Sequence, residues 1–125
     1  MSNENIAILD DDPSMRKALK RLLKAHSYRV RAYELAEQFI DSLRLLVPEC
    51  LILDLNMERI TGDELQHYLA GIGTRIPTII LTGHDKPEIR KRCQRSGAVA
   101  FLVKPVTADQ LFSAIQTALS TRALH

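Results

Sequence analysis

The sequence of 125 residues predicts an α/β fold, in which helices cover both faces of a five-stranded parallel sheet. Four short apolar runs, at residues 6–9, 51–53, 78–81 and 98–103, are typical of strands buried on both faces, because such strands lack polar alternation. Residues 28–33 alternate enough to form a strand at the sheet edge. Helix-like segments separate these strands, so a β-α unit repeats five times and the strands are expected to be parallel.

The segments between the strands carry apolar residues at helical spacing, which predicts five helices. Asp12 is a plausible cap for the first helix, with Pro13 at its first position, and Asp85 can cap the fourth. Capping boxes at residues 61–64 and 107–110 mark the start of the third and fifth helices. The expected buried faces are Met15, Leu19, Leu22 and Leu23; Ala36, Phe39, Ile40 and Leu43; Leu65, Tyr68 and Leu69; Ile89 and Cys93; Leu111, Ile115, Ala118 and Leu119.

Length, charge and composition exclude several classes of protein. A chain of this size fits one compact domain spanning residues 1–125. The net charge of only +2 gives no case for nucleic-acid binding, and no apolar stretch approaches the roughly 20 residues of a membrane span. The polar amino terminus is unlike a signal peptide, so a cytoplasmic protein is expected. Cys50 and Cys93 are expected to be buried, reduced thiols, because two cysteines without paired spacing do not suggest a metal site or a bridge.

Polar residues stand where the predicted buried strands end. They are Asp10, Asp11 and Asp12 after the first strand of the chain, Asp54 after the third, Thr82 after the fourth and Lys104 after the fifth. In a parallel sheet these positions meet at one edge, which is where open α/β sheets place ligand sites.

Asp10, Asp11 and Asp54 would form a carboxylate cluster whose repulsion must be relieved by a proton or a cation. An all-oxygen site with few protein ligands favours Mg²⁺ over Ca²⁺. A metal ion, the Lys104 ammonium and the Thr82 hydroxyl around one carboxylate could stabilise a phosphoryl group during in-line transfer. Asp54 would then be the nucleophile and would form an aspartyl-phosphate.

Five motifs, in order, give the chain a full-length resemblance to the receiver domain of two-component response regulators. They lie at residues 8–13, at 53–57 with 61–62, at 81–84, at 97–98 and at 101–105. The resemblance implies a flavodoxin-like, doubly wound fold with strand order 2-1-3-4-5. It also implies roles for individual residues: Asp54 as phosphoacceptor, Asp10 and Asp11 as the Mg²⁺ pocket, Asn56 as a backbone-carbonyl ligand of the metal, Thr82 and Phe101 as the switch pair, Lys104 as the phosphate-binding lysine, and a cis peptide before Pro105.

The function implied by this resemblance is phosphorelay signalling, not enzymatic turnover of a substrate. A sensor histidine kinase would donate a phosphoryl group to Asp54 with Mg²⁺, and the resulting conformational change would control an output. Residues 81–84 and 97–101 look most similar to receivers of helix-turn-helix regulators, so the expected output is transcription. The fourth helix with the fifth strand and helix is the face that family members use for dimerisation or for output contacts. Arg16 and Lys20 belong to a basic cluster on the first helix that could dock the kinase.

Several alternatives stay open at this point. Glu58 replaces a proline that is usual in the family, and it either perturbs the metal site or points to solvent. His84 either flanks the phosphoryl group or is a solvated loop residue. A phosphohydrolase of the haloacid dehalogenase type would use Asp10 as nucleophile, and a phosphorylation-independent interaction module would not need Mg²⁺. The chain is either a stand-alone receiver or the amino-terminal part of a DNA-binding regulator, and the finish at residues 120–125 fits the second better. The sequence names neither the kinase nor the stimulus.

Overall fold

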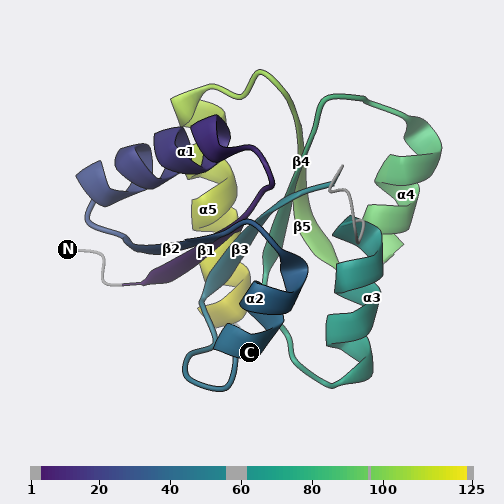
Figure 1. Cartoon of the computed structure of the whole chain (residues 1–125). Coiled ribbons are helices and arrows are strands. Elements are labelled where there is room, and N and C mark those ends of the chain that lie inside the picture. The colour runs from purple at the N-terminus through teal and green to yellow at the C-terminus, as the bar shows by residue number, and fades with distance from the viewer. Residues whose placement is uncertain (1–3, 56–61, 96, 124–125) are drawn as a thin grey trace.

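The computed structural model of the chain describes residues 4–55, 62–95 and 97–123. Its five strands form one parallel sheet in the order β2-β1-β3-β4-β5, which confirms the predicted fold (Figure 1). The strands are β1 (Asn5–Leu9), β2 (Arg29–Tyr33), β3 (Cys50–Asp54), β4 (Thr78–Thr82) and β5 (Ala98–Val103). The helices are α1 (Pro13–Ala25), α2 (Ala36–Ser42), α3 (Gly62–Gly71), α4 (Pro87–Arg95) and α5 (Ala108–Ala123).

Two apolar layers hold the helices against the sheet, one on each face (Figure 1). Successive strand side chains point to opposite faces, so Ile6 and Ile8 of β1 pack with α1 and α5. Ala7 and Leu9 pack instead with residues of α2, α3 and α4. Full burial of one such leucine or isoleucine stabilises the fold by roughly 1.5–3 kcal/mol. Packing on both faces therefore holds β1, β3 and β4 in place, and with them the residues at their carboxyl ends.

The fifth strand departs from the expectation of burial on both faces. All six residues of β5 are only half-buried, because β5 lies at the edge of the sheet and pairs with β4 alone. The residues of β5 are apolar because α4 and α5 partly cover them, and not because the strand lies in the centre of the sheet. The edge strand expected at residues 28–33 is present, but it begins at Arg29 because the Tyr28 N–H donates to the Leu23 carbonyl at the end of α1.

Two of the expected helix caps are confirmed. The Ser14 N–H donates to Asp12 Oδ1 at 2.9 Å, and Thr107 and Gln110 exchange the two bonds of a capping box. The Asp85 prediction is wrong by one residue, since α4 begins at Pro87 and the Asp85 carboxylate accepts from the Arg90 guanidinium. The expected capping box at residues 61–64 begins outside the described residues.

Both cysteines are buried and unbridged, as expected, and they lie in opposite apolar layers. Burial raises the pKa of the Cys50 thiol to about 12, so this side chain behaves as an apolar core residue. Within the described ranges, every helix is too short or too polar to cross a lipid bilayer.

Candidate functional site

The carboxyl ends of β1, β3, β4 and β5 bring the predicted polar residues to one edge of the sheet. Asp54 is the last residue of β3 and Thr82 the last of β4, so both lie one position inside the strands and not in loops. The Asp10 N–H donates to the Tyr33 carbonyl, which extends the β1–β2 pairing by one residue. On the other side, the Lys104 N–H donates to the Thr82 carbonyl at 2.7 Å. These backbone bonds position Asp10 and Lys104 on either side of Asp54.

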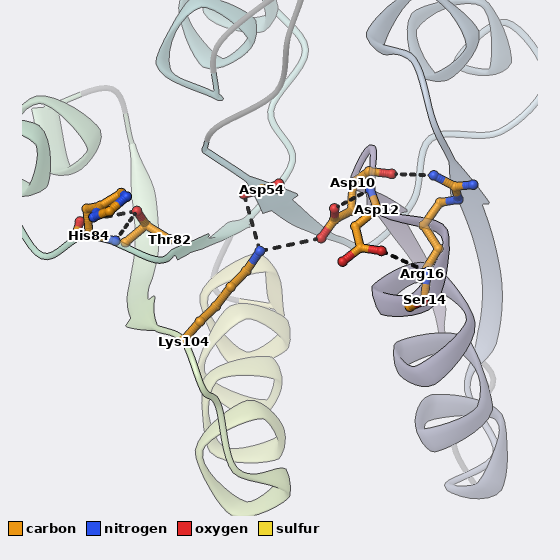
Figure 2. A network of polar contacts seen from close by, with 8 residues as sticks. All are labelled: Asp10, Asp12, Ser14, Arg16, Asp54, Thr82, His84 and Lys104. Atoms are coloured by element: carbon orange, nitrogen blue, oxygen red, sulfur yellow. Dashed lines mark hydrogen bonds and ion pairs between the residues drawn. The ribbon is translucent and has the colours of Figure 1, made fainter.

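Asp10, Asp11, Asp54 and Lys104 form a compact charged group, which we call the acidic cluster. One carboxylate oxygen from each of the three aspartates lies within 4.8 Å of the others. Lys104 Nζ lies 3.5 Å from Asp54 Oδ1 and 3.9 Å from Asp10 Oδ2, so one ammonium bridges two carboxylates (Figure 2). Asp10 is 1% exposed and Asp54 is 5% exposed, and the charges therefore interact with little screening by solvent.

The buried position of Asp10 changes its acidity. Its pKa is raised from 3.8 to about 6, mainly because burial disfavours the charged carboxylate, and the neighbouring Asp54 adds to the effect. The Asp12 N–H, which donates to Asp10 Oδ1 at 2.9 Å, and the Lys104 ammonium both lower the pKa but do not cancel the effect of burial. Asp10 therefore ionises less readily than an exposed aspartate does.

The chemistry of the acidic cluster fits a small divalent cation. Three carboxylates supply only oxygen ligands, which hard ions prefer. Asp10 Oδ2 is buried, accepts no hydrogen bond from any described residue, and lies 3.9 Å from the Lys104 ammonium nitrogen. A cation would remove both the repulsion and this unsatisfied acceptor. Asn56 and Glu58, which were also singled out in the sequence, lie outside the described residues.

Arg16 supports the acidic cluster in a way that the sequence did not reveal. Its Nη1 donates to the Asp10 carbonyl at 2.8 Å (Figure 2), and its Nη2 lies 4.0 Å from Glu34 Oε2. The interpretation of Arg16 as part of a solvated kinase-docking patch is thus incomplete, because this side chain also anchors the backbone that presents Asp10. Arg16 lies one helical turn after the Asp12 cap, a position from which a side chain can reach the end of β1. The sequence gives no reason to expect this contact from Arg16 and not from Lys17.

Thr82 lies at the correct edge, but its hydroxyl is not directed to Asp54. The hydroxyl donates to the His84 carbonyl and accepts from the His84 N–H, both at 3.1 Å. Figure 2 shows Thr82 and His84 paired on one side, while Lys104 reaches across to Asp54 and Asp10. Threonine hydroxyls often bond to backbone groups a few residues away, and Thr82 does so here. The exposed His84 contributes its backbone to this turn.

Phe101 is half-buried on β5 and belongs to the layer that packs with α2, α3 and α4. The Arg90 guanidinium carbon stands 4.7 Å from the centre of the Phe101 ring, and Arg90 Nη2 lies 3.0 Å from Asp85 Oδ1. The aromatic ring is therefore covered by a cation from α4 that is itself held by the loop after β4. Sequence reasoning identified Phe101 but not this cover. The peptide bond before Pro105 is cis, as the family resemblance implied.

Comparisons with known proteins agree with this geometry. The family model described as response regulator receiver domain matches residues 6–116. The response regulator protein TmoT of Ectopseudomonas mendocina is 35% identical over 114 residues, which are 91% of this chain and 52% of that protein. The transcriptional regulatory protein FixJ of Bradyrhizobium diazoefficiens is 32% identical over 115 residues, 92% of this chain and 56% of FixJ.

Solved structures give the same result at the level of the fold. The crystal structure of FixJ-N superposes with a TM-score of 0.88 at 29% identity and covers 96% of both chains. Full-length FixJ from B. japonicum gives a TM-score of 0.90 at 30% identity, with 98% of this chain and 60% of that one covered. The chain spans about half the length of the curated relatives it matches. With a family match over most of its residues, the chain belongs to the response regulator receiver domain family.

Proposed function

We propose that residues 1–125 act as a phosphoacceptor domain, in which Asp54 receives a phosphoryl group from a sensor histidine kinase. The observation that carries this proposal is the contact of one buried carboxylate with an ammonium group, Lys104 Nζ, at 3.5 Å, beside two further carboxylates. A nucleophile of this kind needs positive charge nearby to accept an incoming phosphoryl group. The domain would act as a regulator that participates in its own phosphorylation and not as an enzyme with a separate substrate.

Mg²⁺ would be held by Asp10, Asp11 and Asp54, with the backbone carbonyl of Asn56 as a further ligand, and it would neutralise charge on the transferred phosphoryl oxygens. Lys104 then has a different role in each state. Before transfer its ammonium offsets the charge of Asp10 and Asp54, and after transfer it can bind a phosphoryl oxygen. Arg16 keeps the Asp10 backbone in place throughout.

Thr82 and Phe101 would convert this charge chemistry into a conformational signal. The Thr82 hydroxyl must leave its two bonds to His84 before it can donate to a phosphoryl oxygen on Asp54. That movement vacates space beside β4, which Phe101 on the neighbouring strand β5 can enter. The phosphoryl group would therefore bias a pre-existing equilibrium between two arrangements of the β4–α4 region.

The names of the relatives favour transcription as the output, since FixJ is called a transcriptional regulatory protein. We propose that the chain signals to a DNA-binding partner segment in the cytoplasm and does not itself contact DNA.

Two copies could pair through α4, β5 and α5 when phosphorylated. The basic residues of α1, which include Lys20, would help to dock the kinase.

The proposed acceptor is tested by incubating the protein with acetyl phosphate, with and without Mg²⁺, and measuring the intact mass. We expect a gain of one phosphoryl group that requires both Mg²⁺ and Asp54, so the Asp54→Asn variant should remain unlabelled. Asp12→Asn is the matched control: it removes one carboxylate two positions from Asp10, and asparagine can still cap α1. This control should be labelled as fast as the wild type.

The position of the label separates the rival functions. Fragmentation of the labelled protein should locate the phosphoryl group on Asp54, whereas a phosphohydrolase of the haloacid dehalogenase type would carry it on Asp10. Labelling of Asp54→Asn at wild-type stoichiometry would refute the assignment. A folded protein that never gains mass, even at saturating Mg²⁺, would point to a phosphorylation-independent interaction module.

A further inference from the structure

A cavity of about 410 Å³ lies at the edge of the sheet opposite the acidic cluster. Thr78 at the start of β4 and Gly97 just before β5 form part of its lining, while Thr82 and Val103 end the same strands at the phosphoacceptor edge. Figure 1 shows that α3 ends, and the chain enters β4, at this opposite edge. The volume falls within the roughly 300–1,000 Å³ typical of small-molecule sites. The proposed phosphotransfer does not use this cavity.

An irregularity in the sheet helps to form the cavity. Thr78 pairs with Ala98 and Ile79 pairs with Ala100, so Val99 has no direct partner on β4. This extra residue is a bulge-like irregularity of the ladder, and Val99 lines the cavity. Bulges bend an edge strand locally and are frequent next to functional sites, where they redirect a side chain. The wall between β4 and β5 is therefore shaped differently from the rest of the sheet.

Gln66 places a buried amide group in the lining of this cavity. It lies on α3, lines the cavity, and is only 5% exposed. Its Oε1 is buried and finds no hydrogen-bond partner among the residues that the structure describes. A buried amide oxygen without a partner destabilises the fold, because it has lost its hydrogen bonds to water. A bound molecule with a donor group, or with an ordered water, could satisfy it.

The charged residues of the lining are both positive. Arg75 and Arg95 line the cavity from the segment before β4 and from the end of α4, and both are exposed. The lining includes no aspartate or glutamate, and within the described ranges neither arginine is in an ion pair. The lining also includes the apolar side chains of Leu69, Ile76 and Val99. The site thus combines apolar side chains with two arginines.

We propose that this cavity binds a small amphipathic anion. Its acid group, a carboxylate, sulfonate or phosphate, is held by Arg75 and Arg95, and its apolar body fills the space above Val99. Guanidinium groups bind such oxyanions with charge-assisted, often bidentate hydrogen bonds. The Gln66 amide is a further recognition group inside the cavity, for a hydroxyl or N–H donor on the ligand.

The test uses anilinonaphthalene sulfonate, an aromatic sulfonate that fluoresces in apolar surroundings, as the probe for the full chain. We expect saturable binding at one site. Arg75→Gln and Arg95→Gln should each weaken binding by about fivefold or more, because each removes one charge-assisted contact. Arg21→Gln, which neutralises an exposed arginine on α1 away from the cavity, is the matched control and should bind the probe as the wild type does.

Two further arms make the test specific. Leucine has a shape similar to that of glutamine, and Gln66→Leu removes the unsatisfied amide oxygen. The variant should therefore have a higher thermal midpoint than the wild type when no probe is bound. It should not bind the probe more tightly. Inorganic sulfate carries the charge but no apolar body, so it should displace the probe at least about tenfold less well than an aromatic carboxylate does.

Two-dimensional NMR locates the probe independently of any variant. The Gln66 side-chain amide and the backbone amides of Arg75, Gly97 and Val99 should shift together on titration, while those of Thr82 and Lys104 stay unchanged. Wild-type affinity in the Arg75→Gln/Arg95→Gln double variant would overturn the proposal. So would shifts centred on Lys104, which would place the sulfonate at the phosphoacceptor edge.

Discussion

Asp10 and Asp54, on the β1 and β3 side of the sheet edge, contact Lys104 directly, whereas Thr82 and Phe101, on the β4 and β5 side, are held by groups outside the acidic cluster. We call the first region the acceptor half and the second the switch half. In the acceptor half, buried carboxylates share one ammonium and one oxygen lacks a hydrogen bond. In the switch half, the Thr82 hydroxyl both donates and accepts, and the Phe101 ring has a cationic cover.

The difference indicates where the energy of phosphorylation would be used. The acceptor half is assembled but electrostatically incomplete, so a cation or a phosphoryl group improves it without large movement. The switch half is locally satisfied, so its rearrangement must break interactions that already exist. Activation is then limited by how far a phosphoryl–Thr82 hydrogen bond outweighs the Thr82–His84 bonds and the Arg90–Phe101 interaction that it replaces. Changing one half at a time tests this division.

The largest expected effect on stability comes from removing the cation of the acceptor half. Lys104→Met keeps the apolar stem but leaves Asp10 and Asp54 without their shared ammonium. We expect a loss of about 2 kcal/mol in the free energy of unfolding, measured by urea titration in chelator at neutral pH, since a partner of buried charges is lost. Adding Mg²⁺ should restore most of it. An unchanged unfolding curve would show that Lys104 contributes little to the free state.

Asp10→Asn should have the opposite sign and a smaller size. Because the folded-state pKa of Asp10 is raised to about 6, the stability associated with its neutral form is complete below the unfolded value and is lost as pH rises through about 6. The variant should therefore be more stable than the wild type by about 1–2 kcal/mol near pH 7.5 in chelator, and by much less near pH 4.

Asp12→Asn provides the control for this pH dependence, because its carboxylate is exposed at the start of α1. Parallel thermal unfolding of the three proteins across the pH range makes the comparison. A stabilisation by Asp10→Asn that is equal at both pH values would contradict burial of the ionised carboxylate as its cause.

The smallest expected effect tests the cover of the switch half. Arg90→Met removes both the cation above Phe101 and the ion pair with Asp85, and it should lower the free energy of unfolding by about 0.5–1 kcal/mol. Lys91→Met changes the next, exposed residue and serves as the control. The Phe101 ring resonances should move in the first variant only. Equal spectra and stabilities for both variants would show that Arg90 does not hold the ring.

The fold was largely predictable because its strands are short apolar runs between capped helices. The end of each run also located Asp10, Asp54, Thr82 and Lys104 at one edge, since parallel strands share their direction. The half-burial of β5 was missed, although the strand order places β5 at the edge, because an apolar run looks the same in a central strand and in a partly covered edge strand. Burial on both faces is a property of the neighbours and not of the run itself.

The finer contacts of the site were not predictable for a different reason. The direction of the Thr82 hydroxyl is a choice between a local bond to His84 and a distant carboxylate, and spacing does not decide it. Arg16 and Arg90 lie in helices with several basic residues, and the sequence does not indicate that these two contact Asp10 and Phe101. Gln66, one polar residue on the buried side of α3, is visible in the sequence, but the cavity beside it depends on a bulge in β5.

The difference between the acceptor half and the switch half is tested most directly by NMR. The measurement compares two backbone amides during phosphorylation with acetyl phosphate and Mg²⁺. The Asp12 N–H donates to Asp10 in the acceptor half, and the His84 N–H donates to Thr82 in the switch half. Relative to protein with Mg²⁺ alone, we predict that the His84 amide shifts and exchanges faster, while the Asp12 amide keeps its protection. Fully phosphorylated protein with an unchanged His84 amide would contradict the account.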